Sequence, residues 1–88
     1  MLTDDFTIPN VLGLHARAAA KLNSIACRYN ASLQVKKDTK AVDARNIMGL
    51  LTLGAAKGNI VTISVEGEEE QQAMAAVREL FARKFDEQ

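Results

Sequence analysis

The chain has 88 residues, of which 48% are hydrophobic and 25% are charged, as in ordinary globular proteins. Eleven Lys and Arg balance eleven Asp and Glu, and there are one Tyr, three Phe and no Trp. The balanced charge and the scarcity of aromatic side chains argue against a nucleic-acid-binding protein. No apolar run reaches membrane-spanning length, and the acidic N-terminus does not resemble a signal peptide. We therefore expect one cytoplasmic domain over residues 1–88, with no membrane partner.

The first part of the chain predicts a strand, a loop and a helix. Residues 2–8 show partial alternation of apolar side chains, and Pro9 ends this strand. Residues 10–13 form a loop, and residues 16–28 have the apolar spacing of a helix. The expected core stripe of that helix is Ala18, Leu22, Ile25 and Tyr29.

The middle of the chain predicts a hairpin followed by a short helix. Residues 32–37 and 40–44 read as two strands joined by a turn. Residues 47–53 are apolar and lie between Asn46, a good N-cap, and Gly54, a good helix stop. We therefore expect a helix there rather than a strand.

The last part predicts a strand over residues 60–66 and a helix over residues 69–84. The helix should bury Ala73, Val77, Leu80, Phe81 and Phe85. The element order is therefore β-α-β-β-α-β-α. The fold class is α+β: a four-stranded antiparallel sheet with three helices on one face buries all the apolar stripes.

Cys27 is the only cysteine and cannot form a disulfide within the chain, which agrees with a reducing compartment. Free cysteine behaves as a small apolar side chain and is often buried. We therefore expect Cys27 in the core.

His15 is the only histidine, and it occupies the N-cap position of the helix expected over residues 16–28. The first N–H groups of a helix have no partner within the helix, and together with the helix dipole they attract anions. Arg17 adds a guanidinium group that suits phosphate, and Gly13 allows an unusual backbone turn nearby. A nucleophilic imidazole beside such a cradle suggests a residue that accepts a phosphoryl group and passes it on.

Other readings of His15 remain open from the spacing alone. A metal site needs three or four ligands, and one His with one Cys falls short, so we expect no metal and no cofactor. A Ser-His-Asp hydrolase needs a cleft that a chain of this size has little room to build. A surface histidine that merely caps a helix fits the local pattern equally well.

Three segments carry a more specific signal: LGLHARAAAKL (residues 12–22), NIMGLLTLGAAKG (46–58) and VTISVEGEEEQQAMAAV (61–77). In this order and spacing they resemble the HPr phosphocarrier family of the bacterial phosphotransferase system. The resemblance implies an open-faced β-α-β-β-α-β-α sandwich. It also implies that His15 accepts a phosphoryl group on Nδ1 from enzyme I and passes it to an EIIA-type protein. Arg17 matches the arginine of the family that stabilises the phosphoryl group, with the backbone N–H groups of Ala16 and Arg17.

The chain departs from the pattern of this family at three positions. Ala18 stands where the family usually has a proline, so entry into the helix is less rigid. Asn46 stands where many members have a serine that a regulatory kinase phosphorylates, so we expect no such control. Leu12, together with the ending FDEQ (residues 85–88), is similar to the nitrogen-related branch called NPr.

The short helix over residues 47–53 predicts a surface for protein partners. Its length does not allow burial on both sides, so we expect Leu50 and Leu53 in the core. The expected docking residues for enzyme I and EIIA-type proteins are Ala20, Ile47, Met48 and Leu51. Exposed apolar clusters often mark interfaces. The chain is expected to be a monomeric carrier rather than an enzyme; the alternative is a regulatory module whose binding to a target is switched by phosphorylation of His15.

Overall fold

The computed structural model describes residues 1–87 and contains one four-stranded antiparallel sheet in the order β1-β4-β2-β3. Its strands are β1 (Leu2–Thr7), β2 (Ser32–Lys37), β3 (Lys40–Asp43) and β4 (Ile60–Glu66). The helices are α1 (Ala16–Arg28), α2 (Ile47–Thr52) and α3 (Glu70–Ala82), followed by a short 3-10 turn, η1 (Lys84–Asp86). The predicted order β-α-β-β-α-β-α is confirmed, and the fold is the expected open-faced sandwich. In this described part of the chain no helix is both long and apolar enough to cross a membrane.

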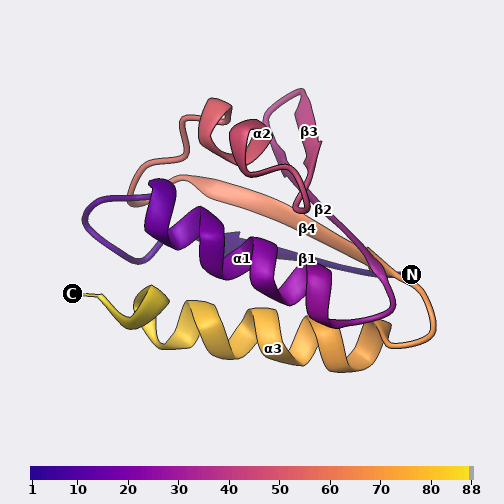
Figure 1. Ribbon diagram of the computed structural model, residues 1–88. Coiled ribbons are helices and arrows are strands. Elements are labelled where there is room, and N and C mark those ends of the chain that lie inside the picture. Colours follow the sequence, from indigo (N-terminus) through magenta and orange to yellow (C-terminus); the bar gives the residue numbers. More distant parts are fainter. Residues whose placement is uncertain (88) are drawn as a thin grey trace.

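The sheet explains why alternate strand residues are apolar. Strand β4 pairs with β1 on one side and with β2 on the other, so β1 and β2 run parallel to each other on either side of it. Its residues Val61, Ile63 and Val65 are almost completely buried, whereas the residues between them stay partly exposed. The buried face carries the helices, with α1 and α3 side by side across the sheet and α2 near β3 (Figure 1).

Helix α1 begins and ends at the residues that the sequence predicts. The expected residues Ala18, Leu22 and Ile25 are buried, and Tyr29 is half-buried at the C-cap position. Ala19 and Ala26 are also buried, so the apolar face of α1 is wider than a single stripe.

The expectation for Cys27 is wrong, because its side chain is exposed. The helical phase puts the neighbouring Ala26 against the core and turns Cys27 toward Asn23, one helical turn earlier, whose Oδ1 lies 4.0 Å from the sulfur. The general tendency of cysteine to be buried is weaker than the register of the helix.

Helix α3 is shorter than the predicted range 69–84. It ends at Ala82, and Arg83 is its C-cap. Lys84, Phe85 and Asp86 then adopt positive φ angles of 55°, 55° and 60°, so the right-handed helix cannot continue through them. The expected core residues of this helix are all buried, together with Met74, which the predicted stripe omitted. As Figure 1 shows, the C-terminal end lies next to the loop that precedes α1.

Asn46 caps α2, as predicted: its Oδ1 accepts a hydrogen bond from the N–H of Gly49 at 3.0 Å. We expect Asn46→Ala to lower the free energy of unfolding by about 0.5–2 kcal/mol, because the substitution removes this acceptor from the first turn. A denaturant titration measures the change. Asn46→Ser is the matched control, since serine is a comparable cap and should leave the midpoint close to that of the parent. An unchanged midpoint for Asn46→Ala contradicts the capping role.

Candidate functional site

His15 lies where the loop after β1 enters α1. It is the N-cap residue, with extended backbone angles, and its carbonyl accepts the first helical hydrogen bond from Ala19 at 2.8 Å. The N–H of Leu14 donates to the carbonyl of Ala55 at 2.9 Å, which ties this loop to the segment before β4. The side chain of His15 is 27% exposed, so the ring is held by the protein but remains accessible.

Hydrogen bonds assign different roles to the two ring nitrogens of His15. The backbone N–H of Arg17 donates to Nδ1 at 3.2 Å, and Nε2 lies 2.6 Å from Oε2 of Glu87. A backbone N–H can only donate and a carboxylate can only accept. The hydrogen of the neutral ring is therefore on Nε2, and the Nδ1 lone pair faces the start of the helix.

Asn10 connects the loop before His15 to Glu87 through two hydrogen bonds. It is fully buried, and its Nδ2 donates to the carbonyl of Gly13 at 2.8 Å and to Oε1 of Glu87 at 3.0 Å. The hydrogen bond from Asn10 is the main cause that lowers the pKa of Glu87. The hydrogen bond from His15 and the charge of Lys21 act in the same direction, as does the charge of the His15 ring when it is protonated, and partial desolvation opposes them. Glu87 is therefore a carboxylate at neutral pH.

The residues expected to bind the phosphoryl group lie at the N-terminus of α1. Ala16 and Arg17 are exposed in the first turn, but the N–H of Arg17 is engaged by Nδ1 of His15 rather than free. The Arg17 guanidinium forms no ion pair with residues 1–87. Leu12, His15, Ala16, Arg17 and Glu87 together line a shallow hollow at the surface. Nowhere in residues 1–87 do three or more His, Cys, Asp or Glu side chains gather that could hold a metal ion.

Three of the four expected docking residues, on α1 and α2, have exposed side chains. Ala20 is exposed, and Ile47 and Met48 are 37% and 68% exposed. Leu51 is half-buried and packs against the core, so the expectation that it faces outward is only partly right. Leu50 and Leu53 are buried, as predicted.

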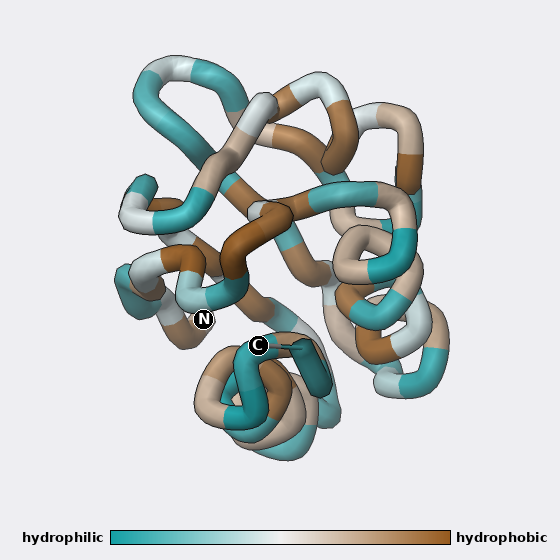
Figure 2. The backbone as a smooth tube through the Cα atoms, turned by 90° about the vertical axis from the view of Figure 1, so that its left-hand side faces the viewer, coloured by the Kyte–Doolittle hydropathy of each residue, from teal (hydrophilic) through white to brown (hydrophobic). Residues whose placement is uncertain are grey.

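The sequence did not single out Val11, Asn10 or Glu87. Val11 and Leu12 are 63% and 72% exposed in the loop before His15, and Leu12 lines the same hollow as the imidazole. Figure 2 looks at the molecule from this end, with the C-terminal segment toward the viewer and apolar stretches of chain above it. Two apolar residues, Val11 and Leu12, in a predicted loop could have indicated an exposed docking surface, whereas nothing in the sequence pointed to Asn10 or Glu87.

Known proteins match both the sequence and the fold. The family model described as PTS HPr component phosphorylation site matches residues 2–83. The phosphocarrier protein HPr of Cupriavidus necator is 44% identical over 87 residues, covering 99% of this chain and 98% of the relative. A crystal structure of HPr from Thermoanaerobacter tengcongensis has a TM-score of 0.94 at 40% identity, covering 100% of this chain and 99% of the other. A dimer of HPr from the same organism has a TM-score of 0.76 at 41% identity, covering 91% and 92%.

The match extends over nearly the whole chain, includes the segments around His15 and α2, and agrees with the independently described sheet order. By sequence and by fold, this chain belongs to the HPr family of phosphocarrier proteins.

Proposed function

We propose that this chain relays phosphoryl groups in the phosphoenolpyruvate-dependent phosphotransferase system. Nδ1 of His15 accepts the group from the phosphohistidine of enzyme I and passes it to a histidine of an EIIA-type protein. The observation that carries the proposal is the orientation of His15, whose Nδ1 faces the N-terminus of α1 while Nε2 is bonded to Glu87. Family membership supports the same role.

The chemistry needs little from the carrier beyond position and charge. The Nδ1 lone pair forms a bond to phosphorus as the bond between phosphorus and the donor nitrogen breaks, in line with the attack. For this attack the N–H of Arg17 leaves Nδ1 as the phosphoryl group approaches and donates to a phosphoryl oxygen instead, and the N–H of Ala16 and the Arg17 guanidinium add further donors. The reverse step returns the electron pair to Nδ1, so the protein is unchanged after each cycle and acts as a carrier rather than a turnover catalyst.

Incubation with enzyme I and phosphoenolpyruvate tests the proposal. We expect one phosphoryl group per chain, labile in acid and stable in base, which then moves to an EIIA-type protein. A chain that takes no label contradicts the carrier function. A chain that takes label, passes none on and binds a target differently afterwards supports the regulatory alternative instead.

We further propose that enzyme I and EIIA-type proteins dock on the apolar group formed by Val11, Leu12, Ala20, Ile47, Met48 and Leu51. These side chains lie on the loop before α1 and on two helices that contact each other, and Leu12 lines the hollow beside His15. Contact between exposed apolar side chains and water is unfavourable, and a partner that covers them removes this contact and so gains binding free energy.

Met48→Glu should weaken binding to enzyme I by about tenfold to a hundredfold, because it puts a charge into an apolar contact. At 68% exposure the same change should leave the melting temperature nearly unchanged. Titration calorimetry and a melting curve on one preparation measure both effects. Gln71→Glu, an added carboxylate at an exposed position on α3, is the matched control and should bind as the parent does. A large loss of stability in Met48→Glu shows instead that Met48 supports the core.

A further inference from the structure

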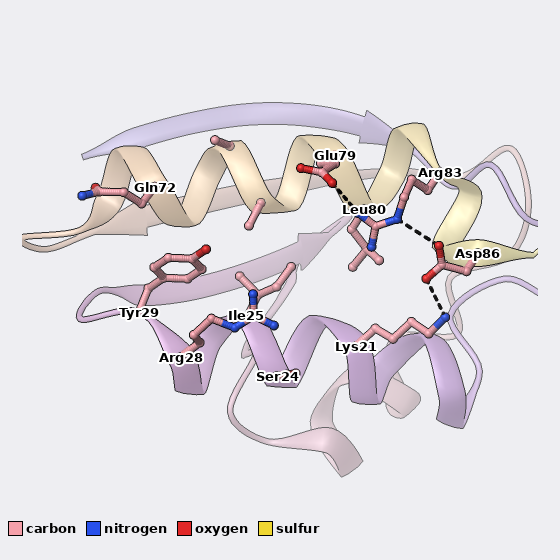
Figure 3. Close-up of a pocket in the computed structure, with 12 residues that line it drawn as sticks. Lys21, Ser24, Ile25, Arg28, Tyr29, Gln72, Glu79, Leu80, Arg83 and Asp86 are labelled. Atoms are coloured by element: carbon pink, nitrogen blue, oxygen red, sulfur yellow. Dashed lines mark hydrogen bonds and ion pairs between the residues drawn. The ribbon is translucent and has the colours of Figure 1, made fainter.

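The last residues of the chain are attached to both long helices by a series of charged contacts. Arg83 pairs with Glu79 and with Asp86, each at 2.9 Å. Asp86 also accepts from Nζ of Lys21 on α1 at 2.9 Å, as Figure 3 shows. Lys21 donates in addition to the carbonyl of Phe85 at 2.8 Å. The segment that follows α3 is therefore bonded to α1 at two consecutive residues, Phe85 and Asp86.

The backbone of this segment is strained, and burial of Phe85 offsets the strain. Three consecutive residues other than glycine have positive φ, a backbone region that residues with a Cβ atom adopt only at a cost. Phe85 is fully buried and packs edge-to-face on Phe81, with ring centroids 4.8 Å apart. Such strain persists only where the surroundings over-determine the conformation. Tertiary contacts thus hold residues 84–86 in an unfavourable backbone conformation, and the next residue, Glu87, contacts His15.

The strained path delivers the Glu87 carboxylate to His15. Both oxygens of Glu87 are used, one by Nε2 of His15 at 2.6 Å and the other by Nδ2 of the fully buried Asn10 at 3.0 Å. Asn10 uses both of its donors in the site, and within residues 1–87 its Oδ1 is left without a partner. A buried acceptor without a partner is costly, so the orientation of Asn10 serves its two donors.

We propose that residues 84–87 form a C-terminal latch and that Glu87 is the positioning residue for His15. The inference rests on the proposed function and deepens it. Rotation of the ring would break the hydrogen bond between Nε2–H and Glu87, so this bond favours the orientation that presents Nδ1 to an incoming phosphoryl group. As the N–P bond forms, the proton stays on Nε2 and the ring becomes cationic. The Glu87 carboxylate then faces that positive charge, with Lys21 and Arg17 as the other charged groups beside the site.

Ring spectra of the unphosphorylated, 15N-labelled protein test the latch without any transfer reaction. We expect a slowly exchanging Nε2–H signal of His15 in the parent protein, because the proton is bonded and partly shielded. Glu87→Ala should lose this signal to fast exchange. Glu87→Gln should retain it in part, because the amide oxygen still accepts. Glu66→Gln, at an exposed carboxylate at the far end of β4, is the matched control and should give the parent spectrum.

Steady-state phosphorylation by enzyme I tests the positioning role. Glu87→Ala should lower kcat by about tenfold to a hundredfold with KM for this chain nearly unchanged, because a misplaced nucleophile slows transfer while the docking residues are intact. Glu87→Gln should fall between this variant and the parent, and Glu66→Gln should match the parent. An identical His15 spectrum in Glu87→Ala, or an unchanged kcat, overturns the proposal. A parent protein that takes no label overturns the proposed function, and the spectra then still decide whether the latch exists.

Discussion

His15→Ala is expected to abolish phosphorylation by enzyme I and phosphoenolpyruvate completely. The sequence contains no other histidine, so no second imidazole is available to take the group. The nucleophile is the Nδ1 atom itself, and neither the N–H groups at the start of α1 nor Arg17 can form a bond to phosphorus in its place. Intact-mass measurement at neutral pH, followed by acid treatment, records the label and its lability.

The backbone contacts that build the helix start do not depend on the imidazole. The carbonyl of His15 still accepts from Ala19, and the N–H of His15 still donates to the carbonyl of Gly13. His15→Ala loses only the capping bond from Arg17 and the contact with Glu87, so its circular dichroism spectrum should match that of the parent. A folded His15→Ala protein that still takes an acid-labile label would falsify the carrier hypothesis.

Local pattern was a good guide to α1 and a poor one to the end of α3. Helix α1 begins after an N-cap and continues through an alanine-rich stretch with one apolar face, so propensity, capping and periodicity agree. At Arg83 and Lys84 the same kinds of evidence favoured a continued helix. The observed turn is instead determined by tertiary contacts, the burial of Phe85 and the bonds from Lys21, which lies more than 60 residues earlier.

In the candidate site, too, some residues are brought together by the local sequence and others only by tertiary contacts. His15 and Arg17 are two residues apart and share a helix start, so their proximity follows from the local sequence. Glu87 reaches His15 across 72 positions of the chain, and the fully buried Asn10 bonds Glu87 across 77. No spacing rule relates such residues, and only the folded path of the C-terminal segment brings them together.

Gly13→Ala is expected to destabilise the fold and displace the site at the same time. Gly13 has a φ of +69°, and a methyl group built on it would lie 2.6 Å from the carbonyl oxygen of Ala55 and 3.0 Å from Cα of Ala56. That oxygen cannot move away freely, because it accepts a hydrogen bond from Leu14 at 2.9 Å. The left-handed backbone costs an alanine about 1–2 kcal/mol. The steric overlap adds about 1–3 kcal/mol, so the total loss is about 2–5 kcal/mol.

For a domain of this size, at about 4–8 °C per kcal/mol, the loss corresponds to a fall in melting temperature of about 8–40 °C. Gly58→Ala separates the two contributions, because Gly58 has a φ of +88° and nothing within 4 Å of an added methyl group. It should lose only about 1–2 kcal/mol from the backbone and keep its phosphotransfer. Gly13→Ala should lose both stability and transfer rate, since the carbonyl of Gly13 binds the N–H of His15 and Nδ2 of Asn10. Equal losses of stability in the two variants contradict a clash with Ala55. Normal phosphotransfer in Gly13→Ala shows that the loop can shift without moving the imidazole.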